Sequence, residues 1–308
     1  MRIRAIVEPP ENFPEFIHDV AEGLTQLYGN AAGEAYRRIA PKSVAATMRA
    51  REVRTYCAEV SKEPAGMAMV VFREGRGRIP FIHVLRPHWG TGVESLLVHE
   101  AVKTLRKRGV DSIASECIPF CDVELRKPFE ELGFQVFPRQ LMIVDTHLLS
   151  HLGVGVAHSA PCTAFEMAGA AEAIAAAYDG HPERALHPDV QDAASAEAYI
   201  RSSLQGAYGL SHPEYVRVVR GHDRVLGVIV GCEVAPGVGF VLQLAVRPDA
   251  QKRGLGRVLI QDLATCFLKR GMNRTALGVT LSNPARHLYL RLGFEPLRNV
   301  AAFVWMRP

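Results

Sequence analysis

The stretch that decides the fold is Leu244-Ala245-Val246-Arg247-Pro248-Asp249-Ala250-Gln251-Lys252-Arg253-Gly254-Leu255-Gly256. It begins as an apolar run typical of a strand, turns at Arg-Pro, crosses a polar segment and ends in Gly-x-Gly. Over residues 256–269, apolar side chains then recur at helical spacing. Gly271 suits the position just beyond a helix end. The pattern predicts a strand, a turn and a long helix in that order.

The start of this predicted helix is suited to bind an anion. Glycines let the backbone approach a ligand closely, and the first N–H groups of a helix have no partner within it. The helix dipole favours negative charge at the same end, and Lys252, Arg253 and Arg257 add positive charge. A pyrophosphate is the natural ligand. Gly-x-Gly alone is more often a structural turn, and this stretch matches neither the phosphate-loop nor the dinucleotide pattern.

The rest of the C-terminal half alternates helical and strand-like segments. The predicted helices, besides the long one, are 168–178, 193–204 and 284–292, and the predicted strands are 215–220, 225–234, 240–246, 275–280 and 301–306. The first two strands are joined by Gly221-His222-Asp223-Arg224, which favours a hairpin. This order predicts an α/β fold, in which helices flank a mixed, mostly antiparallel central sheet.

A second pattern follows the first in the chain: Asn283-Pro284-Ala285, and then Tyr289, three residues and Gly293-Phe294. The first stretch resembles the Q/R-x-x-G-x-G/A signature of the GNAT superfamily of N-acetyltransferases. The second resembles the next motif of that superfamily, in the right order and at the right distance. The resemblance covers residues 162–308, and the two motifs together are specific.

The resemblance implies that acyl-CoA (acetyl-CoA or another acyl-CoA) lies where two parallel strands, 240–246 and 275–280, splay apart. It implies that backbone groups near Val246 hold the pantetheine arm and polarise the thioester carbonyl, while amides of 251–256 bind the pyrophosphate. The cofactor-binding residues predicted on this basis, with Asn283 on the CoA arm, are Leu244, Ala245, Val246, Gln251, Lys252, Arg253, Gly254, Leu255, Gly256, Arg257 and Asn283. Asn283 before Pro284 also suits a helix N-cap, and both roles can hold.

Tyr289 is the predicted catalytic residue. The amine attacks the thioester directly, a backbone N–H near Val246 stabilises the oxyanion, and the CoA thiolate leaves. A phenol with an ordinary pKa of about 10 can protonate the departing sulfur as a general acid. The alternative is that Tyr289 only packs its ring on the sheet.

The general base cannot be assigned from the sequence. The superfamily often places a carboxylate on the strand where this chain has Gln243, and an amide does not accept a proton usefully. Glu233 on the preceding strand and a water held by backbone carbonyls are the remaining candidates. A solvent-facing strand position is the simpler explanation of Glu233.

The N-terminal half repeats the C-terminal half weakly. Arg86-Pro87 and Arg247-Pro248 are 161 residues apart, both are followed by Gly-x-Gly, and Phe129 stands at the place of Tyr289. His88-Trp89 replaces the polar loop, which is three residues shorter when Gly90 is matched to Gly254. We therefore expect a degenerate copy that keeps the fold without efficient transfer, and in which Phe129→Tyr creates no activity.

These features divide the chain into three predicted parts. Residues 1–147 form a degenerate GNAT-like domain, and residues 162–308 form the catalytic domain that binds acyl-CoA. Residues 148–161 contain Gly, Ser and Pro without a sustained period, which is typical of a linker.

Composition sets the wider expectations. The chain has 308 residues, a formal net charge of +4, 48% hydrophobic and 22% charged residues, typical of an ordinary globular protein. That charge is too small to favour nucleic acid, and neither a signal peptide nor an apolar run long enough for a membrane is apparent. The six cysteines (Cys57, Cys117, Cys121, Cys162, Cys232 and Cys266) form no metal pattern. We expect a cytoplasmic protein with reduced cysteines and no metal.

The acceptor is the least defined part. We expect a small-molecule or peptide amine, and the resemblance implies that residues 178–191 and 300–306 shape its site. Within the first of these segments, Tyr178-Asp179-Gly180-His181-Pro182-Glu183 mixes acidic and aromatic residues. A polar surface loop is an equally good explanation of that stretch, and the oligomeric state is open. The competing function is a non-catalytic acyl-CoA sensor. The presence of Tyr289 favours an acyltransferase. The lack of an assignable general base leaves the sensor as an alternative.

Overall fold

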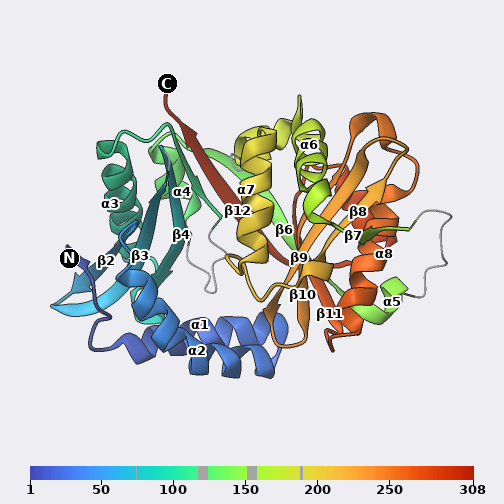
Figure 1. The fold of residues 1–308 in the computed structure, drawn as a ribbon. Helices are drawn as coiled ribbons and strands as arrows, with labels where there is room; N and C mark the ends of the chain where they lie inside the picture. The colour runs from blue at the N-terminus through green and yellow to red at the C-terminus, as the bar shows by residue number, and fades with distance from the viewer. Residues whose placement is uncertain (74, 117–123, 151–157, 188–189) are drawn as a thin grey trace. The chain divides into compact units, whose positions relative to one another are not determined.

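The chain forms two compact units in the computed structural model, which describes residues 1–73, 75–116, 124–150, 158–187 and 190–308. Unit 1 comprises Met1–Pro138 and Val300–Pro308, and unit 2 comprises Arg139–Asn299. Each is an α/β unit whose helices flank a central sheet (Figure 1). The predicted fold class is therefore confirmed.

Unit 1 is built on a sheet of strand order β1-β2-β3-β4-β5-β12. Its elements are β1 (Arg2–Ile6), α1 (Phe13–Tyr28), α2 (Asn30–Met48), β2 (Val53–Val60), β3 (Glu63–Arg73), β4 (Arg76–Val84), η1 (Arg86–His88), α3 (Val93–Lys107), β5 (Ser112–Ser115), α4 (Arg126–Glu131) and the end of β12 (Glu295–Met306). Among the described residues of this unit, β4 and β5 pair in parallel, whereas the pairs β1–β2, β2–β3, β3–β4 and β5–β12 are antiparallel.

Unit 2 has the strand order β6-β11-β10-β9-β8-β7. Its elements are the end of β6 (Gln135–Asp145), α5 (Thr146–Ser150), β7 (Ala160–Pro161), η2 (Ala164–Glu166), α6 (Met167–Tyr178), η3 (Pro182–Leu186), α7 (Ala193–Leu204), η5 (Pro213–Tyr215), β8 (Val216–Arg220), β9 (Val225–Ala235), β10 (Val238–Val246), η6 (Pro248–Ala250), α8 (Leu255–Leu268), β11 (Arg274–Thr280) and α9 (Ala285–Arg291). Each helix and strand predicted for the C-terminal half is present, with ends shifted by a few residues.

Helices cover both faces of the sheet in unit 2 because each presents an apolar stripe. The stripe of α8, which includes Leu259, Leu263 and Phe267, packs on one side in a core completed by α9. The alanine-rich helix α6 and α7 pack on the other side in a second core. Burying both faces leaves little of the sheet exposed, and its strands are accordingly rich in valine and isoleucine.

Each unit contains a strand from the other half of the sequence. Residues 139–145 of β6 pair antiparallel with β11 in unit 2, and Phe303–Met306 of β12 pair antiparallel with β5 in unit 1. The predicted domains, 1–147 and 162–308, instead leave each strand with its own half of the chain. The predicted domain boundaries remain predictions. The compact units differ from the predicted domains because each unit includes the end strand of the other half.

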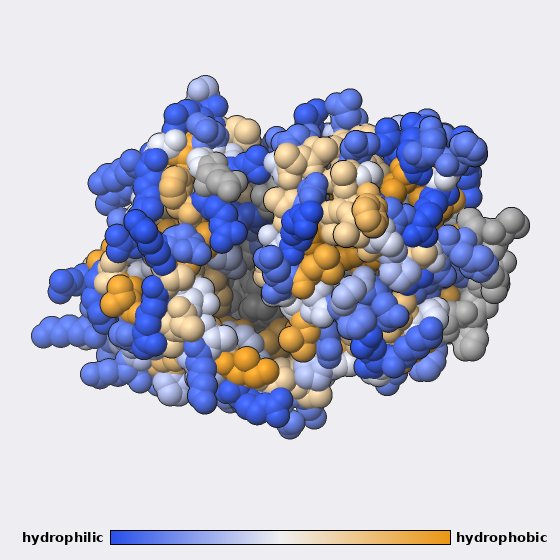
Figure 2. Space-filling view, viewed as in Figure 1, coloured by the Kyte–Doolittle hydropathy of each residue, from blue (hydrophilic) through white to orange (hydrophobic). Residues whose placement is uncertain are grey.

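Hydrophilic side chains cover most of the visible surface of both units, and hydrophobic ones form small separate groups (Figure 2). Among the described residues, no helix is both long and apolar enough to span a membrane. The four described cysteines form no disulfide, and Cys57, Cys232 and Cys266 are buried. Cys117 and Cys121 lie outside the described residues, as do residues 151–157 of the predicted linker 148–161.

Candidate functional site

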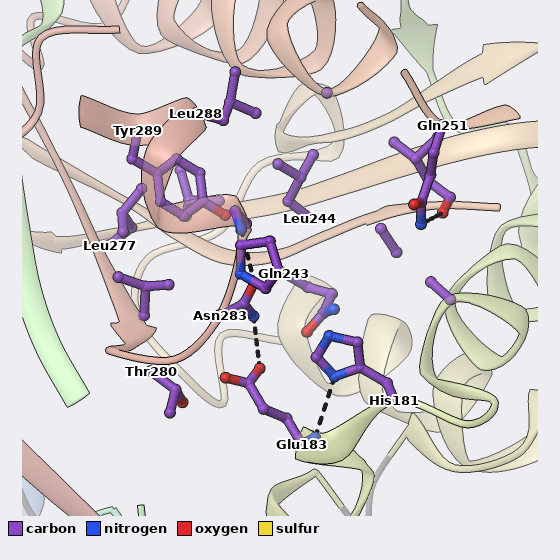
Figure 3. Close-up of a pocket in the computed structure, with 18 of the residues that line it drawn as sticks. His181, Glu183, Gln243, Leu244, Gln251, Leu277, Thr280, Asn283, Leu288 and Tyr289 are labelled. Atoms are coloured by element: carbon purple, nitrogen blue, oxygen red, sulfur yellow. Dashed lines mark hydrogen bonds between the residues drawn. The ribbon is translucent and has the colours of Figure 1, made fainter. Parts of the chain in front are cut away.

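A cavity of about 680 Å³ lies within unit 2. Its walls come from the ends of β10 and β11, the start of α8, the helix α9 and the loop after α6 that contains η3. Figure 3 shows side chains from these elements converging on one space. Segments far apart in the chain thus supply a single site.

The cavity opens where β10 and β11 separate. The two strands pair in parallel only from Val238↔Arg274 to Val241↔Leu277, and a register shift against β9 follows between Val241 and Gln243. Beyond that bulge β10 stays paired to β9 on its other side. Alternate backbone N–H and C=O groups of β10 therefore have no strand partner on the cavity side. The V-shaped gap that the resemblance implied is present.

The three residues predicted at the end of β10 all line the cavity: Leu244, Ala245 and Val246. Leu244 and Val246 are half-buried, and Ala245 is buried against the opposite core. The alternation is that of a strand, in which successive side chains point to opposite faces. The backbone, which both faces share, is the part of this strand available to a ligand.

The helix α8 begins at the cavity with a glycine in the left-handed region. Gly254 is its N-cap at φ 80°, a conformation that glycine adopts without steric cost. Gly254, Leu255 and Gly256 line the cavity, and a Cβ atom on Gly256 would lie only 3.3 Å from Leu288 Cδ2. The first turn of α8 therefore presents backbone N–H groups with little side chain in front of them.

Cationic and polar side chains surround this helix start. Gln251, Lys252 and Arg257 line the cavity, and Gln251 Nε2 donates to the carbonyl oxygen of Val246 over 3.2 Å. Arg253 does not line it, since its guanidinium donates to the carbonyl oxygen of Asp249 over 2.8 Å. Thus eleven of the twelve predicted site residues meet in one cavity, and Arg253 is the exception.

Tyr289 reaches the cavity from α9 and is 8% exposed. Its ring packs edge-to-face on Phe294, with centroids 5.8 Å apart. Burial raises the pKa of the Tyr289 phenol well above its ordinary value; Tyr178 and Glu183 raise it further and Arg139 lowers it. The phenol therefore carries its proton at neutral pH.

Asn283 links two walls of the cavity. Its side-chain oxygen accepts from the backbone N–H of Ala285 over 2.9 Å, a capping contact at the start of α9. Its amide nitrogen donates to Glu183 Oε2 over 2.7 Å (Figure 3). The capping role of Asn283 is present, and its contact with the CoA arm stays a prediction.

The two positions considered for a general base differ in location. Gln243 is 6% exposed and donates through Nε2 to the Tyr178 hydroxyl over 3.0 Å in the cavity wall. Glu233 is not a cavity residue, and it accepts from the backbone N–H of Gly237. Glu233 therefore lies outside the cavity that contains the other predicted site residues.

The sequence analysis did not predict the place of Arg139 in the cavity or the contact between Glu183 and Asn283. Arg139 comes from β6, and its guanidinium donates to the carbonyl oxygen of Gly278 over 3.0 Å. The loop with Glu183 was singled out, but not the contact with Asn283, a hundred positions further along the chain. Both features bring together segments that are far apart in the chain, and a local sequence motif does not predict which distant segments meet.

The equivalent place in unit 1 has a different composition. The helix α3 also starts at a left-handed glycine, Gly92, so Gly92 rather than Gly90 corresponds to Gly254. With this match the loop after Arg-Pro is one residue shorter, and not three as the sequence suggested. The residue corresponding to Gly256 is then Glu94, a buried carboxylate in the first turn of α3.

Other groups fill the rest of that place in unit 1. Trp89 Nε1 donates to the carbonyl oxygen of Val84 over 2.8 Å. Phe129 is fully buried, stacked on Phe303 with ring centroids 4.2 Å apart. A carboxylate where an anion would bind, and a ring without a hydroxyl, both argue against acyl transfer in unit 1.

In the described part of the chain no three His, Cys, Asp or Glu side chains cluster at metal-binding distance.

Comparison with known proteins gives one family. The profile described as "Acetyltransferase (GNAT) family" matches residues 20–134 and 167–294, which is a match in each half of the chain. A mycothiol acetyltransferase of Rhodococcus jostii (strain RHA1) is 35% identical over 132 residues, 42% of this chain and 42% of that protein. Another, of Rhodococcus opacus (strain B4), is 41% identical over 69 residues, 22% of this chain and 23% of that protein. The matches thus span less than half of these relatives.

Solved structures share the fold across the whole chain. A GCN5-related N-acetyltransferase of Sphaerobacter thermophilus has a TM-score of 0.62 at 18% identity, covering 99% of this chain and 96% of that one. A tandem GNAT protein from the clavulanic acid biosynthesis pathway has a TM-score of 0.57 at 14% identity, covering 100% and 99%. At these identities the likeness concerns the fold alone.

Proposed function

The chain belongs to the acetyltransferase (GNAT) family, and on that premise we propose that it transfers an acyl group from acyl-CoA to an amine in the cavity of unit 2. The observation that carries the proposal is the meeting of three features in one cavity. These are the splayed strands β10 and β11, the glycine start of α8 and the buried hydroxyl-bearing ring of Tyr289. Acetyl-CoA is the proposed donor, in keeping with the family's name.

The cavity fits the chemistry of CoA. A pyrophosphate at the start of α8 would accept from its free N–H groups, with Lys252 and Arg257 balancing its charge. The pantetheine arm carries amide groups, and the unpaired backbone edge of β10 offers it complementary donors and acceptors. The roles of Gln251, Gly254, Leu255, Gly256 and Asn283 in this binding remain part of the proposal.

The proposed reaction is a direct attack of a neutral amine on the thioester carbonyl carbon. A backbone N–H of β10 near Val246 would stabilise the oxyanion. As the carbon–sulfur bond breaks, Tyr289 would give its phenolic proton to the CoA sulfur. Its raised pKa keeps that proton available throughout the neutral range.

The acceptor is proposed to be a small polar amine. Tyr178, His181, Glu183 and His187 line the cavity from the α6–α7 side, and all four have polar groups. The named relatives are mycothiol acetyltransferases, and such amines belong to the candidates, although the aligned segments cover only part of those proteins. A peptide amine and the cytoplasmic location remain predictions from the sequence.

The first experiment is a calorimetric titration of acetyl-CoA into the intact chain and into Gly256→Glu. The variant places in α8 the residue that unit 1 has in α3, so we expect one site in the wild type and loss of binding by at least about 100-fold in the variant, as one buried like-charge contact costs several kcal/mol. Gly256→Ala is the control, because its Cβ meets only the movable ends of the Leu288 and Leu244 side chains.

Each outcome has a definite meaning. Two sites in the wild type, or unchanged affinity in Gly256→Glu, would contradict the assignment of the cofactor to unit 2. Binding of acetyl-CoA without turnover of any amine would favour the sensor function instead.

A further inference from the structure

We propose that Glu183 and Thr280 together form the docking site for the ammonium group of the acceptor, and that Glu183 takes the proton which the amine must lose. The inference rests on the proposed function and names the acceptor class: a basic amine that arrives protonated. Glu183 would also act as the general base, a role that the amide side chain of Gln243 cannot fill.

Two oxygens of the cavity wall are buried and unsatisfied. Glu183 Oε1 and Thr280 Oγ1 have no hydrogen-bond partner among the described residues, and both residues line the cavity. Glu183 is 5% exposed and Thr280 is 3% exposed. Leaving such atoms without a partner costs free energy. They are the only cavity residues of the described chain with this property.

The chemistry of these oxygens defines the missing partner. A carboxylate oxygen only accepts hydrogen bonds, and a threonine hydroxyl can accept as well. A group with several donors and a positive charge satisfies both at once, and an ammonium has three N–H donors. A hydroxyl acceptor would bring one donor and no charge, leaving the buried carboxylate uncompensated.

The carboxylate is held in place from its other side. Glu183 Oε2 accepts from Asn283 Nδ2 over 2.7 Å, and the backbone N–H of Glu183 donates to His181 Nδ1 over 3.2 Å. Oε1 is thereby left for a ligand. In Figure 3, Glu183 and Thr280 both appear at the end of the cavity below Asn283.

This end of the cavity is electrostatically coupled to the proposed acid. Glu183 and Tyr289 both line this cavity, and the charge of Glu183 contributes to the raised pKa of the Tyr289 phenol. A base and an acid are therefore available to one bound acceptor. Glu183 lies in residues 178–191, one of the two segments that were expected to shape the acceptor site.

The proposed reaction releases one proton for each acyl group transferred. The R–NH₃⁺ group gives one proton to the Glu183 carboxylate, and the freed lone pair forms the bond to the thioester carbonyl carbon. The carbon–sulfur bond breaks, the sulfur takes the Tyr289 proton, and the tyrosinate recovers a proton from the nitrogen that has become an amide. One proton remains on Glu183 and passes to solvent. Exclusion of water favours the first step, because two charges become a neutral pair.

A purely structural role of Glu183 is the alternative. In that case the side chain only ties the α6–α7 loop to the start of α9 through Asn283. Glu183→Gln separates the two roles, because its side-chain oxygen still accepts from Asn283 while its charge is gone. The matched control is Glu172→Gln on the exposed face of α6.

The test is a ligand-observed NMR titration of the full chain with CoA present, so that no turnover occurs. The probes are benzylamine, glucosamine and putrescine, each compared with its hydroxyl counterpart: benzyl alcohol, glucose and 1,4-butanediol. We expect at least one amine to bind more tightly than its counterpart, and Glu183→Gln to weaken that amine by about 10- to 100-fold, the worth of a hydrogen bond to a charged group. Thr280→Val should weaken it by about 3- to 10-fold.

Three results would overturn the inference: no amine binds, hydroxyl counterparts bind equally well, or the preference for amines survives in Glu183→Gln. Acetyl-CoA affinity, measured separately by calorimetry, should be the same in the wild type, Glu183→Gln and Glu172→Gln. Loss of acetyl-CoA binding in the wild type would instead defeat the proposed function, so the two failures are distinguishable.

For any amine that is turned over, the pH profile gives a second readout. Without the carboxylate only the neutral amine can enter, so kcat/KM of Glu183→Gln should rise tenfold per pH unit up to the pKa of the amine. The wild type should rise less steeply over the same range. Parallel profiles would show that Glu183 acts only as a structural tie.

Discussion

Among single residues, the two halves of the chain differ most clearly at the paired positions Tyr289 and Phe129. Both rings are buried, but Tyr289 faces a cavity and Phe129 packs between Phe303 and Phe134, with ring centroids 4.2 and 5.0 Å away. A hydroxyl at position 129 would be buried among aromatic rings. Phe129→Tyr is therefore expected to lose stability without gaining activity.

Tyr289→Phe tests the proposed acid. The ring keeps its packing on Phe294 and only the proton is lost, so we expect kcat to fall by about 100-fold, which is typical of a missing general acid. The dissociation constant of acetyl-CoA should not change, since the phenol acts on the leaving sulfur. Steady-state kinetics with a saturating amine and calorimetry measure the two quantities. A kcat within twofold of the wild type would remove Tyr289 from the mechanism.

Some residues of the cavity could be predicted from the sequence, and others could not. The glycines of α8 and the residue pair Asn283 and Tyr289 could be predicted, because they stand at fixed places relative to a helix start. Arg253 was predicted with them but turns back to Asp249, since a neighbouring carbonyl offered a nearer partner. The contact of Glu183 with Asn283 needs the fold, because the two segments meet only after the sheet has formed.

Among the elements, the start of α6 shows how one side chain ties a helix to the sheet. Glu166 accepts from the Thr163 hydroxyl over 2.7 Å and from the Thr163 backbone N–H over 3.0 Å, and both its oxygens bind Arg220 of β8. The hydrogen bond from Arg220 lowers the pKa of Glu166 to about 2, although burial opposes it and the bonds from Thr163 contribute.

Glu166 should therefore make the stability of this region depend on acid. Its folded pKa lies below the ordinary value of about 4.3, so its contribution is complete above that pH and is lost as pH falls toward 2. We expect Glu166→Gln to lower protection of the α6 amides by about 1 kcal/mol at pH 7, and the difference to vanish near pH 2. Hydrogen exchange at matched pH measures it, with Glu172→Gln as control. An equal difference at both pH values would contradict the assignment.

The helices and strands themselves were predictable because their signals are local. The apolar spacing of α8, the hairpin turn between β8 and β9 and the glycine after α8 each act within a few residues. It was harder to predict which glycine of the N-terminal half corresponds to Gly254. Gly90 and Gly254 look alike in sequence, but the start of α3 at Gly92 and of α8 at Gly254 identifies Gly92 as the counterpart.

Over the whole molecule, the exchanged strands decide which pieces of the chain can stand alone. β11 lies between β10 and β6, and β6 brings Met142 and Val144 into the core of unit 2. The sequence predicted the strand 301–306 as the end of the C-terminal half, and it made no prediction for the strand that became β6. Which sheet each end joins depends on pairing over long distances, and no local pattern specifies it.

Two fragments test this division. Residues 162–308 lack β6, so β11 would have an open edge and the core would lack Met142 and Val144. We expect this fragment to aggregate, and residues 135–299 to fold and to bind acetyl-CoA. Circular dichroism measures whether each fragment folds, and calorimetry measures whether it binds acetyl-CoA. A folded, binding fragment 162–308 would show that β6 is dispensable.

The same exchange governs the order in which the protein matures on the ribosome. β5 is complete at Ser115, but its neighbour in the sheet includes Phe303, which packs on Phe129. At 5–20 residues per second, the intervening chain takes roughly 10 to 40 seconds to synthesise. Unit 1 begins before unit 2 and closes after it, so during each round of translation the edge of its sheet at β5 awaits residues 303–306. This interval is a window for chaperone binding that a simple succession of two domains would not have.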